Sequence, residues 1–369
     1  MTLTNYWWLL IWMFTGAAFL AIFVPKRQEM VLGKKETRWT PFAAMLMALP
    51  YIVWAGFRGD GFGDTGAYRA TVRTAPDSLA QLGEYLSTID KDKGFSVLVV
   101  LFKTLVNNSD KFFFLLVAAF QMACLIHLYR KYSCNYWFSI FVFVATTDYM
   151  SWMHNGLRQF IAVSIILAST DWIIQKKYLR VILMILLAST FHASALLMIP
   201  ALFIIQGKAW NKKTIIALGL SLVAIVMVDQ FTNVLDTLLA DTQYSNMVTD
   251  WQEWNDDGTN PIRVLVYSVP TILSVVGLKW IRREDNPIIN MSVNASICGT
   301  GLYIISMVTS GIFIGRLPIY FTLWASGVLL PWEIKNFFTR DSQKIVWIAS
   351  VAAYSLFYVY QMHFAWGIM

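Results

Sequence analysis

The chain has 369 residues, of which 57% are hydrophobic and only 14% are charged, and its mean hydropathy is +0.54. This balance excludes a soluble globular protein, and the net charge of +7 is spread between apolar runs, which argues against a nucleic-acid partner. Three cysteines without CxxC spacing, Cys124, Cys134 and Cys298, predict neither a disulfide framework nor a metal site. Because lipid cannot satisfy backbone polar groups, long apolar runs such as 7–24 predict an all-α membrane protein.

Apolar runs long enough to cross a bilayer occur along the whole chain. The first lacks a preceding basic region and a small-residue cleavage site, so we expect a retained span rather than a removable signal peptide. The stretch 178–205 is too long for one upright helix and is interrupted by polar residues, so it predicts a helical hairpin. Single spans are expected near 6–24, 40–57, 112–129, 136–152, 157–175, 214–233, 262–281, 291–310, 315–333 and 344–363.

The distribution of Lys and Arg predicts the orientation of these spans. Nineteen of the 29 basic residues fall in six connections, which the positive-inside rule assigns to the cytoplasm: 25–38, 129–135, 175–180, 207–213, 279–285 and 333–344. The parity of crossings then requires an amphipathic or re-entrant helix near 94–107 to stay on the outer side. We therefore predict about twelve transmembrane helices in a single integral membrane domain, 1–369, in a bacterial inner membrane, with both termini outside.

Two predicted outer loops, 58–93 and 234–261, are long enough to have structure of their own. The second carries Trp251 and Trp254 among carboxylates, a combination that suits the apolar faces and hydroxyl rims of sugar rings. An aromatic belt at the membrane interface is the alternative interpretation of these tryptophans.

The first outer loop opens with the motif R58-G-D-G-F-G-D-T-G-A-Y68. It places Arg58, Asp60, Asp64 and Tyr68 just beyond a span, and its glycines permit tight turns and close approach of a ligand. A solvated turn with incidental acids is the structural alternative.

A second polar motif, H154-N-G-L-R158-Q159, lies at the outer turn between two spans. On one helix His154 and Arg158 would be spaced i, i+4, and Asn155, Arg158 and Gln159 would share a face. Ionisable residues at membrane depth indicate function by default, although Arg158 could instead snorkel to lipid headgroups.

Two further outer positions complete the candidate site. His192 lies in the polar break of 178–205, where a packing role is the alternative, and Arg316 with Tyr320 begins a later span. Arginine can neutralise a departing diphosphate without a metal, and an Asp or His can act as general base. The pattern D90-K91-D92 is interleaved with lysines and is interpreted as a solvated charge run.

At these residues the chain resembles the EpsG family of exopolysaccharide and capsule proteins. These are Wzy-type polymerases of lipid-linked repeat units, a class that includes O-antigen polymerases. The resemblance covers about residues 55–325. Its elements are R58-G-D…D64-T-G-A-Y68, G94-F-S-V-L, N155-G-L-R158-Q159-F-I-A162, F191-H192-A-S194-A195 and R316-L-P-I-Y320-F321. Family members often carry an acidic residue before the glycine-phenylalanine pair, where this chain has Lys93.

The resemblance implies a fold similar to the GT-C glycosyltransferases, an undecaprenyl-diphosphate-linked glycan as donor and a second lipid-linked unit as acceptor. It implies that Asp64 or Asp60 is the general base, with His192 as the rival. It also implies that the diphosphate is bound by Arg158, Arg316 and Arg58. The residues expected to line the glycan pocket are Tyr68, His154, Asn155, Gln159, Tyr320, Trp251 and Trp254. The expected partners are membrane lipid, a flippase and a chain-length regulator. No cofactor is expected.

The expected reaction is inverting, metal-independent glycosyl transfer on the outer face. Two alternatives stay open: a lipid-linked oligosaccharide flippase or transporter, which usually has repeated halves and midplane charges, and a membrane acyltransferase that uses His192 as base.

Overall fold

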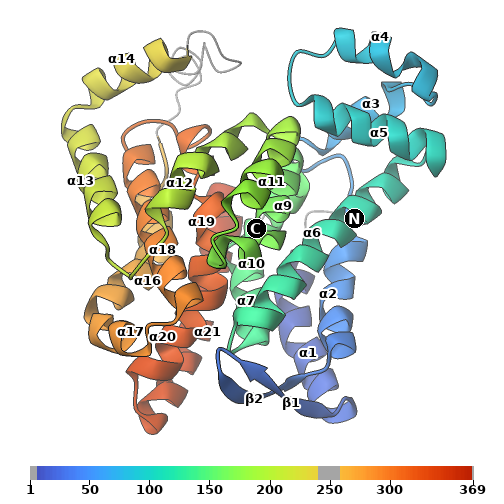
Figure 1. The fold of residues 1–369 in the computed structure, drawn as a ribbon. Helices are drawn as coiled ribbons and strands as arrows, with labels where there is room; N and C mark the ends of the chain where they lie inside the picture. Colours follow the sequence, from blue (N-terminus) through green and yellow to red (C-terminus); the bar gives the residue numbers. More distant parts are fainter. Residues whose placement is uncertain (1–5, 240–257, 368–369) are drawn as a thin grey trace. The chain divides into compact units, whose positions relative to one another are not determined.

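The computed structural model describes residues 6–239 and 258–367, and these form helices apart from one β-hairpin (Figure 1). The described residues divide into two compact units. The first comprises Met1–Leu196 and Phe338–Met369, and the second comprises Leu197–Phe337.

The first unit contains the hairpin and most of the predicted polar motifs. Its strands are β1 (Lys26–Val31) and β2 (Lys34–Trp39). Its helices are α1 (Trp7–Phe23), α2 (Pro41–Gly56), α3 (Thr65–Thr74), η2 (Leu79–Gln81), α4 (Leu82–Ser87), α5 (Lys93–Leu105), α6 (Asp110–Tyr132), α7 (Tyr136–Ala145), α8 (Asp148–Met150), η3 (Ser151–Asn155), α9 (Leu157–Ala168), α10 (Thr170–Ile174), α11 (Tyr178–Phe191), α21 (Arg340–Tyr360) and η7 (Gln361–Ala365).

The second unit is built around α18, which is almost wholly buried. The 3₁₀ turn η4 (Ala193–Leu197) leads into this unit. Its helices are α12 (Met198–Ile204), α13 (Lys212–Val226), α14 (Val228–Leu239), α16 (Pro261–Val276), α17 (Leu278–Glu284), α18 (Pro287–Ser306), η5 (Ile314–Arg316), α19 (Ile319–Trp324), η6 (Ala325–Leu329) and α20 (Leu330–Phe337).

The helices confirm the all-α membrane class. Within 6–239 and 258–367, three helices are long and apolar enough to cross a bilayer, namely α6, α18 and Arg340–Ala365, and α16 with α17 forms a fourth candidate that is bent by 73°. Six further apolar helices have 10–17 residues. Predicted spans 136–152 and 157–175 are divided at Thr147, which has a φ of 63°, and at Ser169, so the count of twelve crossings stays a prediction.

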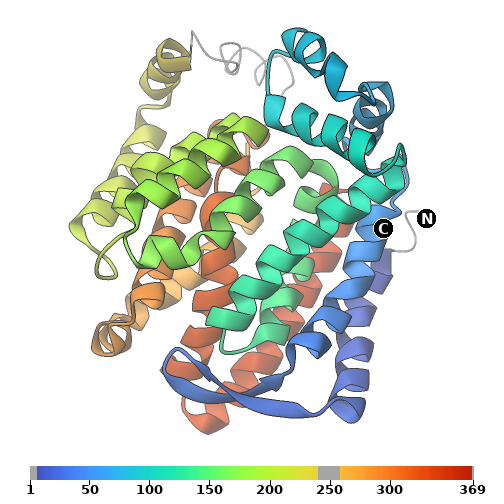
Figure 2. The same cartoon turned by 45° about the vertical axis from the view of Figure 1, so that its right-hand side comes forward.

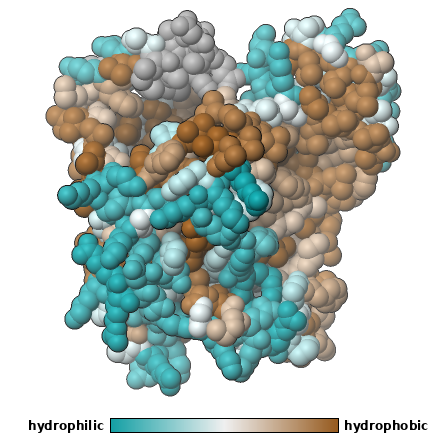
Figure 3. Space-filling model, viewed as in Figure 1, coloured by the Kyte–Doolittle hydropathy of each residue, from teal (hydrophilic) through white to brown (hydrophobic). Residues whose placement is uncertain are grey.

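Lipid-facing character is visible on the first unit, where apolar side chains cover α5 and α6 (Figure 3). Phe112, Leu116 and Phe120 of α6 are 37–43% exposed, and Leu105 at the end of α5 is 72% exposed. The opposite face of α5 buries Phe95, Val99, Val100 and Phe102. The structure thus contains the amphipathic helix expected near 94–107.

The polar interruption predicted within 178–205 falls at a single residue. Helix α11 ends at Phe191, and His192 adopts an extended conformation with φ −160° and ψ 117°. A 3₁₀ turn and α12 follow. His192 therefore lies at a helix end rather than inside a continuous helix.

The hairpin β1–β2 lies across the ends of neighbouring helices of the first unit (Figure 2). Six residues of each strand pair in antiparallel register around Leu32 and Gly33, which both have positive φ, as two-residue hairpin turns require. The sequence analysis treated 25–38 only as a connection. The sequence pattern that indicates this hairpin is two strand-length runs separated by a two-residue turn that contains glycine.

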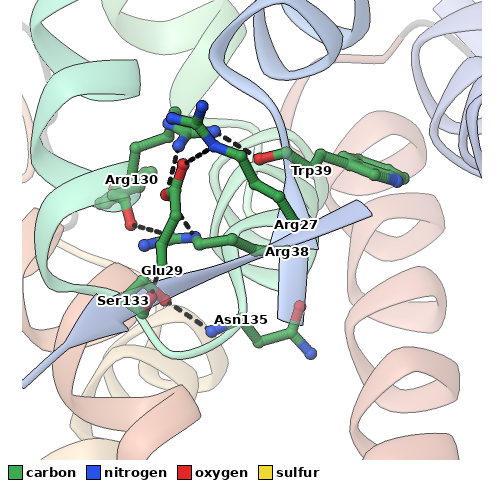
Figure 4. Close-up of polar contacts among 8 residues, drawn as sticks. Arg27, Glu29, Arg38, Trp39, Arg130, Ser133 and Asn135 are labelled. Atoms are coloured by element: carbon green, nitrogen blue, oxygen red, sulfur yellow. Dashed lines mark hydrogen bonds and ion pairs between the residues drawn. The ribbon is translucent and has the colours of Figure 1, made fainter. Parts of the chain in front are cut away.

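One carboxylate ties the hairpin to α6 (Figure 4). Glu29 binds Arg27 at 2.6 Å and also binds Arg130, while Arg38 lies 3.7 Å away. Arg130 also donates to the backbone carbonyl of Trp39, so both strands are held. Burial opposes the ionisation of Glu29, but Arg27 and Arg130 outweigh this effect and lower its pKa.

We predict that Glu29→Gln lowers the stability of the purified protein by about 1–3 kcal/mol at pH 7, because charge-assisted hydrogen bonds are lost. The lowered pKa means that this stabilisation is present above the unfolded value of about 4.3 and is lost as the pH falls through the folded value. Apparent Tm measured in detergent against pH checks both parts. The exposed Glu84→Gln is the control, and equal Tm values for wild type and Glu29→Gln at pH 7 would contradict the prediction.

Candidate functional site

The motif R58–Y68 is held against Asn155, two residues before the start of α9. Asp64 is the N-cap residue of α3, and its backbone N–H donates to Asn155 Oδ1 at 3.0 Å. Tyr68 Oη donates to the backbone carbonyl of Asn155, also at 3.0 Å. Gly63 has a φ of +51°, and a Cβ there would overlap the Asn155 side chain. These contacts bring two predicted motifs, distant in sequence, to one place in the first unit.

Arg158 lies in the first turn of α9, beside this contact. Its guanidinium carbon is 5.8 Å from the centroid of the Tyr68 ring, and its side chain is 32% exposed. About a third of the side chain is therefore accessible to a ligand, although Nε is buried without a hydrogen-bond partner among the described residues.

The helix expected to carry both His154 and Arg158 is interrupted between them. His154 belongs to a π-helical turn, and Gly156 with φ −87° and ψ 42° separates that turn from α9. The imidazole is fully buried, with Phe62 and Tyr149 edge-on at 5.9 and 5.1 Å. His154 lies inside the protein rather than beside Arg158, and Gln159 is only 3% exposed.

Asp92 is the site residue that the sequence analysis missed. Its side chain is 5% exposed, and Oδ2 binds Arg158 Nη1 at 2.9 Å. Oδ1 is buried without a hydrogen-bond partner among the described residues. Burial raises the pKa of Asp92, while the charge of Arg158 and a backbone hydrogen bond of Ala193 act in the opposite direction.

Asp92 was hidden by its sequence context. Interleaved lysines made D90-K91-D92 look like a solvated run, and Asp90 is indeed exposed. Asp92 instead adopts a left-handed conformation, φ 56° and ψ 40°, immediately before α5, and this turns it inward. A weak signal was available, because Asp tolerates this conformation and a Gly-Phe pair follows at the helix start.

Asp60 and Arg58 take part in internal contacts. Asp60 forms an ion pair with Arg69, which also lies 3.2 Å from Asp110. Arg58 is 3% exposed, donates to the carbonyls of Ala55 and Met153 at 3.0 Å, and lies over the Phe114 ring. The Asp60 side chain is nevertheless 59% exposed, and the Asp64 side chain is also exposed, at the start of α3.

The break at His192 approaches the start of α5. A Cβ at Gly94 would overlap Thr190, so the last turn of α11 lies directly against this helix. His192 Nδ1 is 2.6 Å from Ser194 Oγ, and the ring is partly exposed. Asp92, Arg158 and the break thus belong to the same part of the first unit.

Arg316 and Tyr320 belong to the second unit. Arg316 ends η5 and is partly exposed, whereas Tyr320 in α19 is 1% exposed. The preceding Gly315 lies against Thr259, whose backbone N–H donates to the Ser306 carbonyl at 2.8 Å. Trp251 and Trp254 lie outside the described residues.

The fold is that of a predominantly helical membrane protein, and an Asp92–Arg158 ion pair lies at its helix ends. A family model described as the EpsG family matches residues 42–366, nearly the whole chain, so the protein belongs to the EpsG family. Membership and the apolar helices together indicate a membrane protein of polysaccharide biosynthesis. No curated protein and no solved structure matches the chain.

We predict that Gly63→Ala destabilises the protein by about 1–3 kcal/mol, because the left-handed backbone is strained and the new Cβ displaces Asn155. Gly61→Ala is the matched control, since no atom lies within 4 Å of a Cβ there. Apparent Tm in detergent checks the difference. Equal Tm values for the two variants would show that the Asp64–Asn155 contact does not constrain this segment.

Proposed function

We propose that the protein is a polysaccharide polymerase that joins undecaprenyl-diphosphate-linked glycan repeat units by inverting glycosyl transfer without a metal. The observation that carries the proposal is the contact between the Asp64 segment and Asn155, just before α9, where the Arg158 side chain is 32% exposed. A partly exposed guanidinium and an exposed carboxylate, on two segments that Asn155 joins, provide an anion-binding group and a base within one unit. Membership of the EpsG family supports the same reaction class.

In the proposed step, a hydroxyl of the acceptor repeat attacks the anomeric carbon of the donor glycan. The new glycosidic C–O bond forms as the bond from that carbon to the diphosphate oxygen breaks. The bonding electron pair leaves with the diphosphate, and the hydroxyl proton passes to a carboxylate or imidazole. Arg158 stabilises the charge that develops on the leaving diphosphate, since a guanidinium offers paired N–H donors to phosphate oxygens.

Asp64 is the first choice for the base. Its carboxylate is exposed, and its position is fixed by the backbone contact to Asn155. The Asp60 carboxylate is already paired with the Arg69 guanidinium, so protonation of Asp60 would break that ion pair. His192 is the rival, because its ring is partly exposed at a helix end.

The proposal extends to features of the chain that the sequence predicts. Arg316 is a second diphosphate-binding residue, and Tyr68, Asn155, Gln159 and Tyr320 contact or support the bound glycan lipid. Twelve crossings of a GT-C-like fold would present the site to the outer face of the inner membrane. Exopolysaccharide, capsule or O-antigen polymer is the product class, with a flippase and a chain-length regulator as partners.

We predict that Arg158→Ala and Arg316→Ala each abolish chain extension, because loss of a charge-assisted donor to the leaving group costs at least about 10²-fold in rate. The measurement is glycan laddering by membranes supplied with purified lipid-linked repeat. Arg282→Ala, which removes an exposed arginine at a predicted cytoplasmic connection, is the control and should extend chains normally.

A ladder of normal length from both variants, at normal expression, would overturn the assignment. Transfer of a labelled acyl group without laddering would identify the acyltransferase alternative. Movement of the lipid-linked repeat across the membrane without chain extension would identify a flippase.

We predict that Asp64→Asn lowers the extension rate by about 10²–10⁴-fold, as expected for loss of a general base. Asp60→Asn should cost less, because its charge is paired with Arg69 rather than available to substrate. Single-turnover extension in proteoliposomes compares the two variants and His192→Gln. A larger loss in His192→Gln than in Asp64→Asn would transfer the role to the histidine.

A further inference from the structure

The Asp92–Arg158 pair combines a fixed acid with a partly open arginine. Asp92 is held by a left-handed turn before α5 and is 5% exposed, whereas Arg158 is 32% exposed. The open partner can reach a ligand while the closed partner cannot. A substrate that approaches Arg158 therefore meets a guanidinium whose positive charge is already paired with the Asp92 carboxylate.

We propose that Asp92 is the resident counter-ion of Arg158, which balances the guanidinium when the site is empty and weakens its hold on the diphosphate after transfer. The inference rests on the proposed function and assigns a release step to that site. Asp92 acts through Arg158 and is a positioning residue rather than a catalytic one.

Release matters because transfer increases the negative charge of the diphosphate. In the donor, both phosphates carry a carbon substituent, and cleavage of the glycosyl bond leaves a terminal phosphate with one further ionisable oxygen. A lone arginine would bind this product more tightly than the substrate. A carboxylate at 2.9 Å from the same guanidinium weakens the binding of both substrate and product, and it weakens the binding of the more highly charged product most.

Asp92 could instead serve only to orient Arg158. The two roles predict opposite changes in diphosphate affinity when the charge of Asp92 is removed. Asparagine tolerates the left-handed conformation and retains an oxygen acceptor at the same place, so Asp92→Asn removes mainly the negative charge. If balancing charge dominates, the variant binds diphosphate more tightly. If orientation dominates, it binds diphosphate more weakly.

The test uses the full chain in lipid nanodiscs and undecaprenyl diphosphate as the probe. We expect Asp92→Asn to lower the Kd at least about tenfold, which corresponds to about 1.4 kcal/mol. Multiple-turnover extension should slow while the single-turnover rate stays close to that of the wild type. Asp90→Asn, which removes an exposed carboxylate two residues away, is the matched control and should change neither value.

Arg158→Ala provides the second arm. Without the guanidinium, Asp92 loses the largest interaction that offsets the burial of its charge, and only Lys91 and a backbone hydrogen bond of Ala193 remain, so protonation of the carboxylate becomes more favourable. Adding Asp92→Asn to Arg158→Ala should then leave the Kd unchanged. Misfolding cannot imitate the expected result, since it does not tighten binding.

The outcomes separate the two proposals. Unchanged or weaker binding by Asp92→Asn, with binding lost in Arg158→Ala, overturns the counter-ion role and leaves the proposed function standing. Wild-type binding by Arg158→Ala overturns the diphosphate assignment itself. A full effect of Asp92→Asn in the Arg158→Ala background would show that Asp92 does not act through Arg158.

Discussion

The candidate site depends on Asn155, which links two distant parts of the first unit. Its side chain accepts from the backbone of Asp64, and its carbonyl accepts from Tyr68. Gly156 then reorients the backbone before α9 begins, so fixing Asn155 also fixes the helix start that carries Arg158. Neither hydrogen bond is strong alone, but both join segments about 90 residues apart. The Asp64 segment and the helix start that carries Arg158 thereby gain defined positions.

The arginines of the first unit differ in what their surroundings leave open. Arg58 is directed inward onto backbone carbonyls and an aromatic ring, and Arg69 is shared between Asp60 and Asp110. A buried guanidinium is tolerated only when such partners offset its desolvation, so these two residues hold the turn after α2 together. Arg158 has a buried partner on one side and exposure on the other. This asymmetry, rather than arginine identity, distinguishes a group that can bind an anion from one that supports the fold.

The sequence predicted those features that depend on local pattern. Apolar runs gave the helical membrane class, the polar interruption gave the break at His192, and the amphipathic pattern gave α5. Features that depend on one backbone torsion or on a distant partner were missed or misjudged. Asp92 is buried because of a left-handed turn and a partner 66 residues away in the sequence, and the π-helical turn before Gly156 removed the helical spacing of His154 and Arg158. Spacing rules assume a continuous helix, and a single inserted residue is enough to defeat them.

A partly neutralised arginine also suits the glycosyl transfer that we propose. Binding that is equally strong for donor, transition state and product does not accelerate the chemical step. What accelerates the step is the additional attraction gained as charge develops on the leaving oxygen. In the proposed reaction, a fixed carboxylate behind Arg158 opposes each bound species in proportion to its negative charge, and the released diphosphate most, while the guanidinium stays in place to meet the developing charge. Under this proposal, the buried acid adjusts how long the diphosphate stays bound, while the exposed part of the arginine stabilises the transition state.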